Sequence, residues 1–214
     1  MVLIEDKAQQ ANKHKQKNEY WESNGILVNR LPLPVGDYVL VNEQVKDVID
    51  RKTKRKTAIK KMDFLGTYKV CVDTKFGIEE LVNDVVGKQH ERFRDECILA
   101  QNNGIKLYIL VENDGGEIGR TGVYNSVITD LKDLHSWKNP RLFIMKKTDD
   151  VIGYYKNGNP RFRQVQRYPR ATKGQQLMKA CMTMEEKYGC SFIFCRKCDA
   201  GKEVIRLLTE YRER

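Results

Sequence analysis

Two aspartates and a lysine have the types and spacing that metal-assisted hydrolysis of a phosphodiester requires. Asp37 follows Gly36 in the segment PVGDY, and the segment VCVDTK places Asp73 and Lys75 two positions apart. Because side chains alternate along a β-strand, Asp73 and Lys75 are expected on one face of their strand. Carboxylates are ligands that Mg²⁺ prefers, and a nearby lysine can orient an attacking water and offset charge in the transition state. The three residues therefore predict a metal-dependent hydrolytic site.

A second Asp-x-Lys segment, residues 50–52 (Asp-Arg-Lys), competes with this assignment because it also follows an apolar stretch. We prefer Asp73 because the strand before it is more apolar and because an acid, Glu79, stands four positions after Lys75. The residue four positions after the lysine of segment 50–52 is Lys56, which cannot bind a metal. Residues 50–61 are then interpreted as a DNA-contacting segment.

The chain is basic, with 39 Lys and Arg against 29 Asp and Glu and a formal net charge of +10. Residues 51–61 and 153–173 are rich in Lys and Arg and contain no acid, and the second run also holds Tyr154 and Tyr155. Cations neutralise phosphates and aromatic rings stack on bases, so these runs favour a nucleic-acid partner over a merely solubilising surface. The cations expected to contact DNA are Arg51, Lys52, Lys54, Arg55, Arg92, Arg161, Arg163, Arg167 and Lys173.

The elements that must position these residues alternate between strand and helix, which predicts a mixed α/β sheet flanked by helices. Residues 43–70 break the apolar pattern and are expected to form a basic loop or an extended hairpin, and residues 149–172 a basic aromatic loop. Residues 172–211 are expected to form a helix–strand–helix. Strands are predicted at residues 1–6, 25–42 (two strands joined near Pro32–Gly36), 69–73, 105–113, 141–147 and 191–194, and helices at 18–23, 77–103, 172–188 and 199–211.

Several functions and locations are disfavoured by what the sequence lacks. No apolar run approaches the roughly 18 residues that a membrane helix needs, and the first residues do not form a basic leader with an apolar stretch. We therefore expect a soluble, cytoplasmic protein. A phosphate-binding glycine motif ending in Lys-Ser or Lys-Thr is missing from the sequence, so no nucleotide cofactor is expected.

The cysteines and histidines give weaker signals. Cys195 and Cys198 have the C-x-x-C spacing of zinc sites, but a second closely spaced pair is missing, so the cysteines are interpreted as reduced, packed thiols. His90 lies just before Arg92 on the predicted helix and is expected either to contact phosphate or to pack against neighbouring residues of that helix. His14 and His135 are expected at the surface.

The order of these segments resembles the nuclease domain of the XPF excision-repair family. That family carries G-D, a variable gap, E-R-K-x-x-x-D, an arginine–aromatic pair on a helix and an apolar strand. Here the matching segments are Gly36-Asp37, residues 73–79 (DTKFGIE), Arg92-Phe93 and residues 105–112 (IKLYILVE), and the opening LIED matches at Asp6. The resemblance covers nearly the whole chain, but Asp73, Thr74 and Glu79 replace the family's Glu, Arg and Asp. The family's helix-hairpin-helix tail has no counterpart in these residues.

The resemblance implies a Mg²⁺-dependent endodeoxyribonuclease, active also with Mn²⁺, on a single restriction-endonuclease-like domain over residues 1–214. It is most similar to the compact versions carried by phages and mobile elements, and it implies a role in DNA repair or recombination on branched or junction DNA. DNA is the expected partner, and a homodimer follows because relatives act as dimers. The alternative is a catalytically inactive nucleic-acid-binding module on the same fold. The implied catalytic residues are Asp37, Asp73, Lys75 and Glu79, and the implied metal ligands are Asp37, Asp73 and Glu79, with Asp6 assisting through water.

Overall fold

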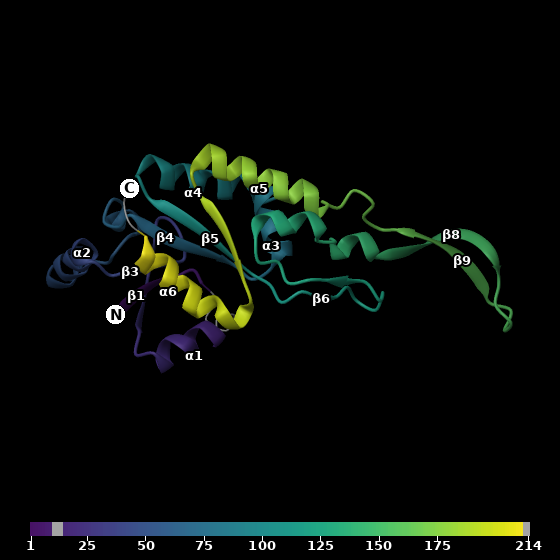
Figure 1. The fold of residues 1–214 in the computed structure, drawn as a ribbon, viewed down its shortest axis with the longest axis horizontal. Helices are drawn as coiled ribbons and strands as arrows, with labels where there is room; N and C mark the ends of the chain where they lie inside the picture. Colours follow the sequence, from purple (N-terminus) through teal and green to yellow (C-terminus); the bar gives the residue numbers. More distant parts are fainter. Residues whose placement is uncertain (10–14, 212–214) are drawn as a thin grey trace.

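The structure, a computed structural model, describes residues 1–9 and 15–211 (Figure 1). The predicted surface position of His14 lies outside the described residues. A six-stranded sheet forms the centre of the fold, with the strand order β10-β5-β4-β3-β1-β2. The strands are β1 (Val2–Asp6), β2 (Leu27–Leu31), β3 (Tyr38–Leu40), β4 (Val70–Lys75), β5 (Lys106–Glu112) and β10 (Ser191–Cys195).

The sheet is mixed. Strands β4, β5 and β10 run parallel to one another, whereas β3 is antiparallel to both of its neighbours, β4 and β1. Strand β2 runs parallel to β1 at the edge. Strand β5 contains a continuous run of five apolar or aromatic residues and β4 begins with three apolar residues, because strands in the middle of a sheet are covered on both faces.

Helices cover both faces of the sheet, as Figure 1 shows. Helices α3 (Ile78–Val85), α4 (His90–Asn102) and α5 (Gly174–Tyr188) pack on one face, and α1 (Lys15–Ser23) and α6 (Ala200–Glu210) on the other. The predicted mixed α/β sheet flanked by helices is therefore confirmed, including the closing helix–strand–helix. In the described residues, no helix is both long and apolar enough to cross a membrane.

The prediction of a loop or extended hairpin over residues 43–70 was wrong. This segment contains helix α2 (Glu43–Lys54) and the short 3₁₀ helix η2 (Lys61–Phe64). The side chain of Asn42 caps α2 by accepting a hydrogen bond from the backbone N–H of Val45 at 2.8 Å. Val45 and Val48 are buried. Cations in the last turn are favoured there by the helix dipole, so the basic run belongs to a helix rather than breaking one.

The prediction for residues 141–172 also needs correction. Residues Pro140–Phe143 form a 3₁₀ helix, η4, and the strand expected at 141–147 begins only at Met145. Strand β8 (Met145–Tyr154) pairs antiparallel with β9 (Pro160–Gln166), so most of the expected loop is a β-hairpin. This hairpin, residues 145–166, projects far from the body of the protein in Figure 1 and is called the arm below. The remaining short elements are β6 (Gly116–Glu117), β7 (Tyr124–Asn125), η3 (Leu131–Ser136) and η5 (Lys197–Asp199).

Gly36, which precedes Asp37, is required by both its conformation and its surroundings. Its φ of +72° lies in the left-handed region that residues with a Cβ seldom adopt. A Cβ at this position would lie 2.8 Å from Cys71 Cβ and 2.9 Å from Cys71 Sγ. The Gly-Asp pair therefore reflects a tight approach of this turn to strand β4, which sets the position of Asp37.

Replacing Gly36 with alanine should destabilise the protein by about 2–4 kcal/mol, because a conformational cost of about 1–2 kcal/mol adds to an overpacking cost of about 1–3 kcal/mol. Gly25 is the matched control. Its φ is +66° but a Cβ there would have no neighbour within 4 Å, so Gly25→Ala should carry only the conformational cost. Urea unfolding of both variants measures the difference, and equal losses would contradict the steric account.

Candidate carboxylate–lysine site

Neighbouring strands bring Asp37 and Asp73 together. Asp37 immediately precedes β3, and its N–H donates to the carbonyl of Val72 in β4 at 2.8 Å. Asp37 Oδ2 accepts two hydrogen bonds from Thr74, one from the backbone N–H at 2.7 Å and one from the hydroxyl at 2.8 Å. Thr74, the residue that departs from the family's arginine, thus fixes the Asp37 carboxylate beside strand β4.

Lys75 is enclosed by two acids. Its Nζ lies 2.7 Å from Asp73 Oδ2 and 2.7 Å from Asp84 Oδ2 on α3, and 4.9 Å from the centroid of the Phe93 ring on α4. Burial opposes the charge of Lys75, but Asp73, Asp84 and Asp37 outweigh it and raise the lysine pKa above its ordinary value. The raised pKa favours the ammonium form of Lys75, which suits a role in electrostatic positioning.

A further carboxylate joins the cluster from helix α4. Glu96 Oε1 accepts a hydrogen bond from the N–H of Gly36 at 2.9 Å, which ties α4 to the turn before Asp37. Burial and the negative charge of Asp73 raise the pKa of Glu96 to about 7. The same helix carries Arg92, which lies exposed and lowers that pKa in part.

The acids of this cluster repel one another. The pKa of Asp73 rises to about 7 because of burial and the nearby Asp37, although Lys75 opposes the rise. Burial also raises the pKa of Asp37, to which Glu96 contributes. Buried carboxylates that repel one another are stabilised by a bound cation, and their oxygens are ligands that Mg²⁺ prefers.

The donor types therefore fit a divalent ion held by Asp37, Asp73 and Glu96. In the part of the chain that the structure describes, however, no three His, Cys, Asp or Glu side chains are arranged as a formed metal site. The ammonium of Lys75 now neutralises Asp73. The cluster supplies suitable donors, and their assignment as ligands belongs to the proposal below.

Asp6 and Glu79 are not among the residues that surround the ammonium of Lys75, which are Asp73, Asp84 and Phe93. Asp6 is buried at the end of β1, and its Oδ1 accepts a hydrogen bond from the N–H of Leu33 at 3.1 Å. Its own N–H donates to the carbonyl of Asp37 at 2.7 Å. Glu79 is exposed on the first turn of α3, and Asp84, one and a half turns further along that helix, is the residue that pairs with Lys75. The roles predicted for Asp6 and Glu79 stay predictions.

The competing segment 50–52 lies in α2, far from this cluster. Asp50 is exposed, and residues two positions apart on a helix do not share a face, so the Asp-x-Lys geometry needed for catalysis is not formed there. Helix α2 follows the end of β3, where Leu40 pairs with Leu3 at the start of β1. Asp37 lies at the other end of β3. The structure thus favours Asp73 and places the basic residues of α2 at the opposite end of the sheet.

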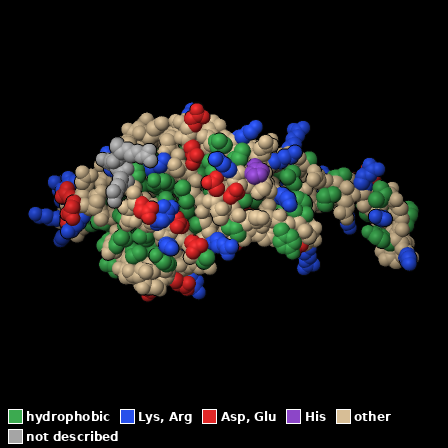
Figure 2. Space-filling view, in the orientation of Figure 1, with side chains coloured by type: hydrophobic (Ala, Val, Ile, Leu, Met, Phe, Trp, Pro, Cys, Tyr) green, Lys and Arg blue, Asp and Glu red, His purple; other side chains and the backbone are tan. Residues whose placement is uncertain are grey.

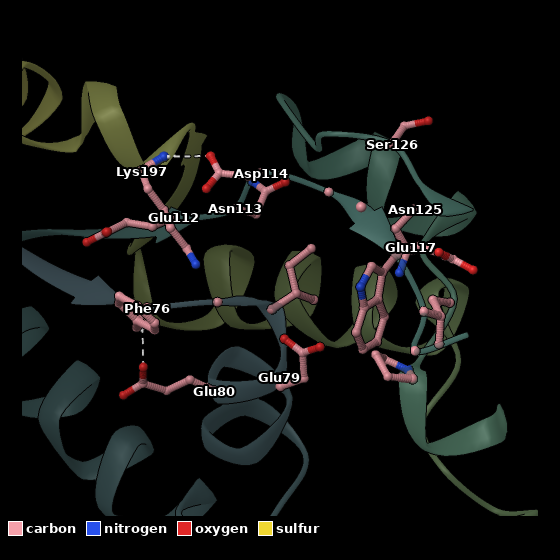
Figure 3. Close-up of a pocket in the computed structure, with 18 residues that line it drawn as sticks. Phe76, Glu79, Glu80, Glu112, Asn113, Asp114, Glu117, Asn125, Ser126 and Lys197 are labelled. Atoms are coloured by element: carbon pink, nitrogen blue, oxygen red, sulfur yellow. Dashed lines mark hydrogen bonds between the residues drawn. The ribbon is translucent and has the colours of Figure 1, made fainter. Parts of the chain in front are cut away.

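An acidic cleft lies next to the cluster, at the carboxyl ends of β4 and β5 (Figure 3). Phe76 contributes its ring, over which Lys197 Nζ lies 4.3 Å from the centroid, and Glu79 points into the cleft. The residues that line the cleft include the acids Glu79, Glu80, Glu112, Asp114 and Glu117. These acids would repel a phosphate backbone.

A basic pocket adjoins helix α3 on the side towards the arm. It is lined by residues of α3, including Val82, and by Arg141, Arg167 and Arg170 at the root of the arm. Figure 2 shows Lys and Arg side chains at both ends of the molecule, over α2 and over the arm. Of the predicted DNA contacts, Arg161, Arg163 and Arg167 belong to the arm or its root, and Lys173 caps α5 nearby.

Two residues of this site, Asp84 and Glu96, were missed by the sequence analysis. The sequence contains a signal for each of these two residues, namely an acid on or beside the apolar stripe of a predicted helix. Glu96 falls within the apolar helical stripe of Phe93, Cys97 and Ala100, and Asp84 falls beside the stripe that contains Leu81. An acid on the buried stripe of a helix is costly unless it has a partner, so such positions indicate a charged site.

The remaining thiols and the histidine fit no such site. Cys195 is buried in β10 and Cys198 is exposed in η5. Cys97 and Cys190 are buried neighbours, and the side chain of His90 has a buried Nδ1 without a hydrogen-bond partner among the described residues. None of them contacts the carboxylate–lysine cluster through a recorded hydrogen bond or ion pair.

Fold and site define a mixed α/β protein with a buried carboxylate–lysine cluster at the junction of β3 and β4. The ERCC4 domain model matches residues 6–208, so the chain belongs to the ERCC4 domain family, the XPF-type nuclease domains. The resemblance inferred from the sequence motifs is confirmed.

Among solved structures, XPF from Aeropyrum pernix matches with 12% sequence identity and a TM-score of 0.47, covering 97% of this chain and 63% of that chain. The chain therefore spans less than two thirds of the archaeal chain that it matches. The search of curated proteins gave no match.

The raised acid pKa values predict how stability depends on pH without a divalent ion. Asp73 and Glu96 have folded pKa values near 7, above their ordinary values of 3.8 and 4.5, so folding favours their protonated forms. Their contribution to stability is complete at low pH and is lost as pH rises through about 7. In EDTA, thermal unfolding should show stability falling from pH 5 to pH 8, by an amount on the order of 3–5 kcal/mol, because each acid contributes over about two pH units of this window and one unit is worth about 1.4 kcal/mol.

Asp73→Asn should reduce this loss, and Mg²⁺ should restore stability at pH 8. Asp47 is a suitable control, because it is an exposed acid on α2 and Asp47→Asn should keep the wild-type pH profile. Stability that stays level or increases between pH 5 and pH 8 in EDTA would contradict the buried, repelling arrangement of the acids.

Proposed function

We propose that this protein is a Mg²⁺-dependent endonuclease that hydrolyses phosphodiester bonds in DNA, with Mn²⁺ as a substitute ion. Membership of the ERCC4 domain family supports a DNA nuclease, and the buried cluster around Lys75 supports an intact catalytic site. The observation that carries the proposal is the single ammonium of Lys75, held between Asp73 and Asp84 beside two further carboxylates.

Each residue of the cluster has a role that its contacts support. Asp37 and Asp73 are the proposed metal ligands, and Glu96 is a third donor from α4. A bound Mg²⁺ would polarise the phosphate and activate a water for attack. Lys75 stays protonated, so it orients the attacking water and offsets negative charge that develops on the phosphate. Asp84 is a positioning residue, because it holds Lys75 from helix α3.

The energetic cost of the cluster argues against a catalytically inactive module on this fold. Mutually repelling, buried carboxylates destabilise a protein that has no ion to bind. A module that only bound DNA would gain from neutral residues at Asp37 and Asp73, since carboxylates beside a polyanion also reduce affinity. The acids are consistent with a site that is used for catalysis.

The distribution of charge supports a path for DNA along the side of α3 that adjoins the root of the arm, away from the acidic cleft. The basic root of the arm adjoins α3, the helix that carries Asp84. The cations of α2 lie at the opposite end, and two of them are engaged with acids, Arg51 with Asp47 and Lys52 with Asp63. Contacts from α2 to DNA therefore require a substrate that extends over the body of the protein. A homodimer, implied by the resemblance, would provide a second such surface and stays a prediction.

Asp73→Asn and Lys75→Ala should each abolish Mg²⁺-dependent cleavage, while leaving DNA affinity within about threefold of wild type. Asparagine lacks the charge that a hard cation needs, and loss of one preorganised electrostatic group typically costs about 10²–10³ in rate. Single-turnover cleavage of labelled DNA and fluorescence anisotropy measure the two properties separately. Cleavage near the wild-type rate in either variant, or undiminished cleavage in excess EDTA, would reject this site.

Asp84→Asn should lower the single-turnover rate by roughly 10-fold or more, because Lys75 loses the partner that holds it on the α3 side. Glu79→Gln is the matched comparison on the same helix, since Glu79 is exposed and makes no recorded ion pair with Lys75. A Glu79→Gln defect as large as that of Asp84→Asn would return the positioning role to Glu79, as the sequence pattern predicted. Wild-type rates for Asp84→Asn would remove Asp84 from the mechanism.

A further inference from the structure

The arm has no core of its own. Every residue of β8 and β9 is exposed or half-buried, and the two strands form a separate two-stranded sheet. A single two-stranded hairpin is marginally stable in water. The arm nevertheless exposes five large apolar side chains, those of Met145, Val151, Ile152, Tyr154 and Tyr155. Burying these side chains against a partner would stabilise both the contact and the hairpin.

The outer part of the arm, residues 151–163, is basic. It contains Lys156, Arg161 and Arg163 and no acid. Arg163 lies 3.7 Å from Asp150, in an exposed pair that screening makes weak. The side chain of Tyr155, next to Lys156 in the sequence, is 58% exposed. The outer arm therefore offers cations and aromatic rings together, which suits an acidic surface with apolar walls.

The acidic cleft at the carboxyl ends of β4 and β5 has this complementary character (Figure 3). Its volume is about 480 Å³. Its walls combine the acids with apolar side chains, which include Phe76, Ile118 and Trp137. Apolar walls lower the local dielectric, so the field of the acids is focused into the cleft.

Most of the acids in the cleft are not neutralised within the chain. Glu112 forms an ion pair with the buried Lys17. The carboxylates of Glu80, Asp114 and Glu117 instead accept hydrogen bonds from backbone N–H groups at 2.8, 3.1 and 2.8 Å. Among the described residues, no Lys or Arg forms an ion pair with these three carboxylates. The cleft therefore has a surplus of negative charge that cations from outside would neutralise.

A second copy of the chain can bring an outer arm to this cleft. Trp137 and Pro140 line the cleft, and Arg141 begins the root of the arm, so cleft and root are adjacent. The arm projects away from the body in Figure 1, which carries its tip away from its own cleft. A two-fold axis across two antiparallel arms, near their midpoints, would place each tip at the root and cleft of the other copy. Such an arrangement is closed and makes each contact twice.

We propose that two copies of the chain associate by reciprocal docking, with the outer arm of each copy in the acidic cleft of the other. Lys156 and Arg161 pair with the acids of the cleft, and the exposed apolar side chains of the two arms pack together. The docked cations would also neutralise acids that repel DNA beside the carboxylate–lysine cluster. The contact is specific to arm and cleft, and it does not depend on the proposed nuclease function.

Sedimentation velocity of the full chain, in EDTA and without DNA, tests the contact. Wild-type protein should form dimers that dissociate more readily as the salt concentration rises, because the paired charges are screened. The arm variant Lys156→Glu/Arg161→Glu and the cleft variant Asp114→Lys/Glu117→Lys should each weaken dimerisation by at least about tenfold, since like charges then meet at both contacts.

Mixing the arm variant with the cleft variant separates a lost contact from a damaged fold. In the mixed dimer, each arm meets a cleft of opposite charge, so dimerisation should return to within about threefold of the wild-type affinity. A misfolded variant could not be restored in this way. Lys54→Glu/Arg55→Glu is the matched control, because it changes the net charge as the arm variant does but lies on exposed positions of the α2 region. It should dimerise as wild type.

Three outcomes would overturn the inference. They are a wild-type protein that stays monomeric, arm and cleft variants that dimerise as wild type, and a mixture of the two variants that does not restore dimers. The second outcome, combined with a loss of DNA affinity in the arm variant, would assign the arm to DNA alone. The nuclease proposal is tested separately, because it fails only if the wild-type protein does not cut any DNA with Mg²⁺.

Discussion

The ammonium of Lys75 is the interaction on which the geometry of the site depends. It lies between Asp73 of β4 and Asp84 of α3 and packs against Phe93 of α4, so one charged group joins a central strand to two of the helices that cover the sheet. Two like charges about 4 Å apart repel by roughly 4 kcal/mol at the effective dielectric of a protein. Without Lys75 or a bound cation, the neighbouring carboxylates could not stay ionised together.

The surrounding fold provides this arrangement through strand order. Placing β3 antiparallel to β4 brings the turn before β3 to the carboxyl end of β4, and Gly36 allows that turn to approach closely. The remaining parallel strands then open a cleft at the same end. Because β3 reverses direction, the helix that follows it, α2, is sent to the other end of the sheet. The arm instead leaves from the catalytic end, beside α3.

Much of this could be predicted from the sequence because apolar runs and glycine-preceded acids are local signals. The strands around Asp73 and residues 105–113 are apolar runs, and the Asp-x-Lys alternation follows from strand geometry alone. Helix α2 was not predicted, since its buried Val45 and Val48 are few among many exposed cations. The arm was assigned to a loop because its strands have no buried face, so neither alternation nor an apolar run marks them.

Asp84 and Glu96 show where sequence reasoning stopped. The contact of Asp84 with Lys75 and that of Glu96 with Gly36 depend on how α3 and α4 pack on the sheet. The spacing of residues along the chain does not reveal this packing. The family motif directed attention to Glu79, the fourth residue after the lysine, which is exposed. The acids on buried helical stripes were the better indicators, because burial makes an unpartnered carboxylate costly.

The central claim is that the buried carboxylates form a divalent-cation site, and direct measurement of Mn²⁺ binding by electron paramagnetic resonance tests it without reference to cleavage. The account predicts that wild-type protein binds Mn²⁺ at neutral pH and that Asp37→Asn and Asp73→Asn each weaken binding by at least about tenfold, through loss of a charged hard ligand. An unchanged affinity in both variants, or no bound Mn²⁺ in the wild-type protein, would contradict it.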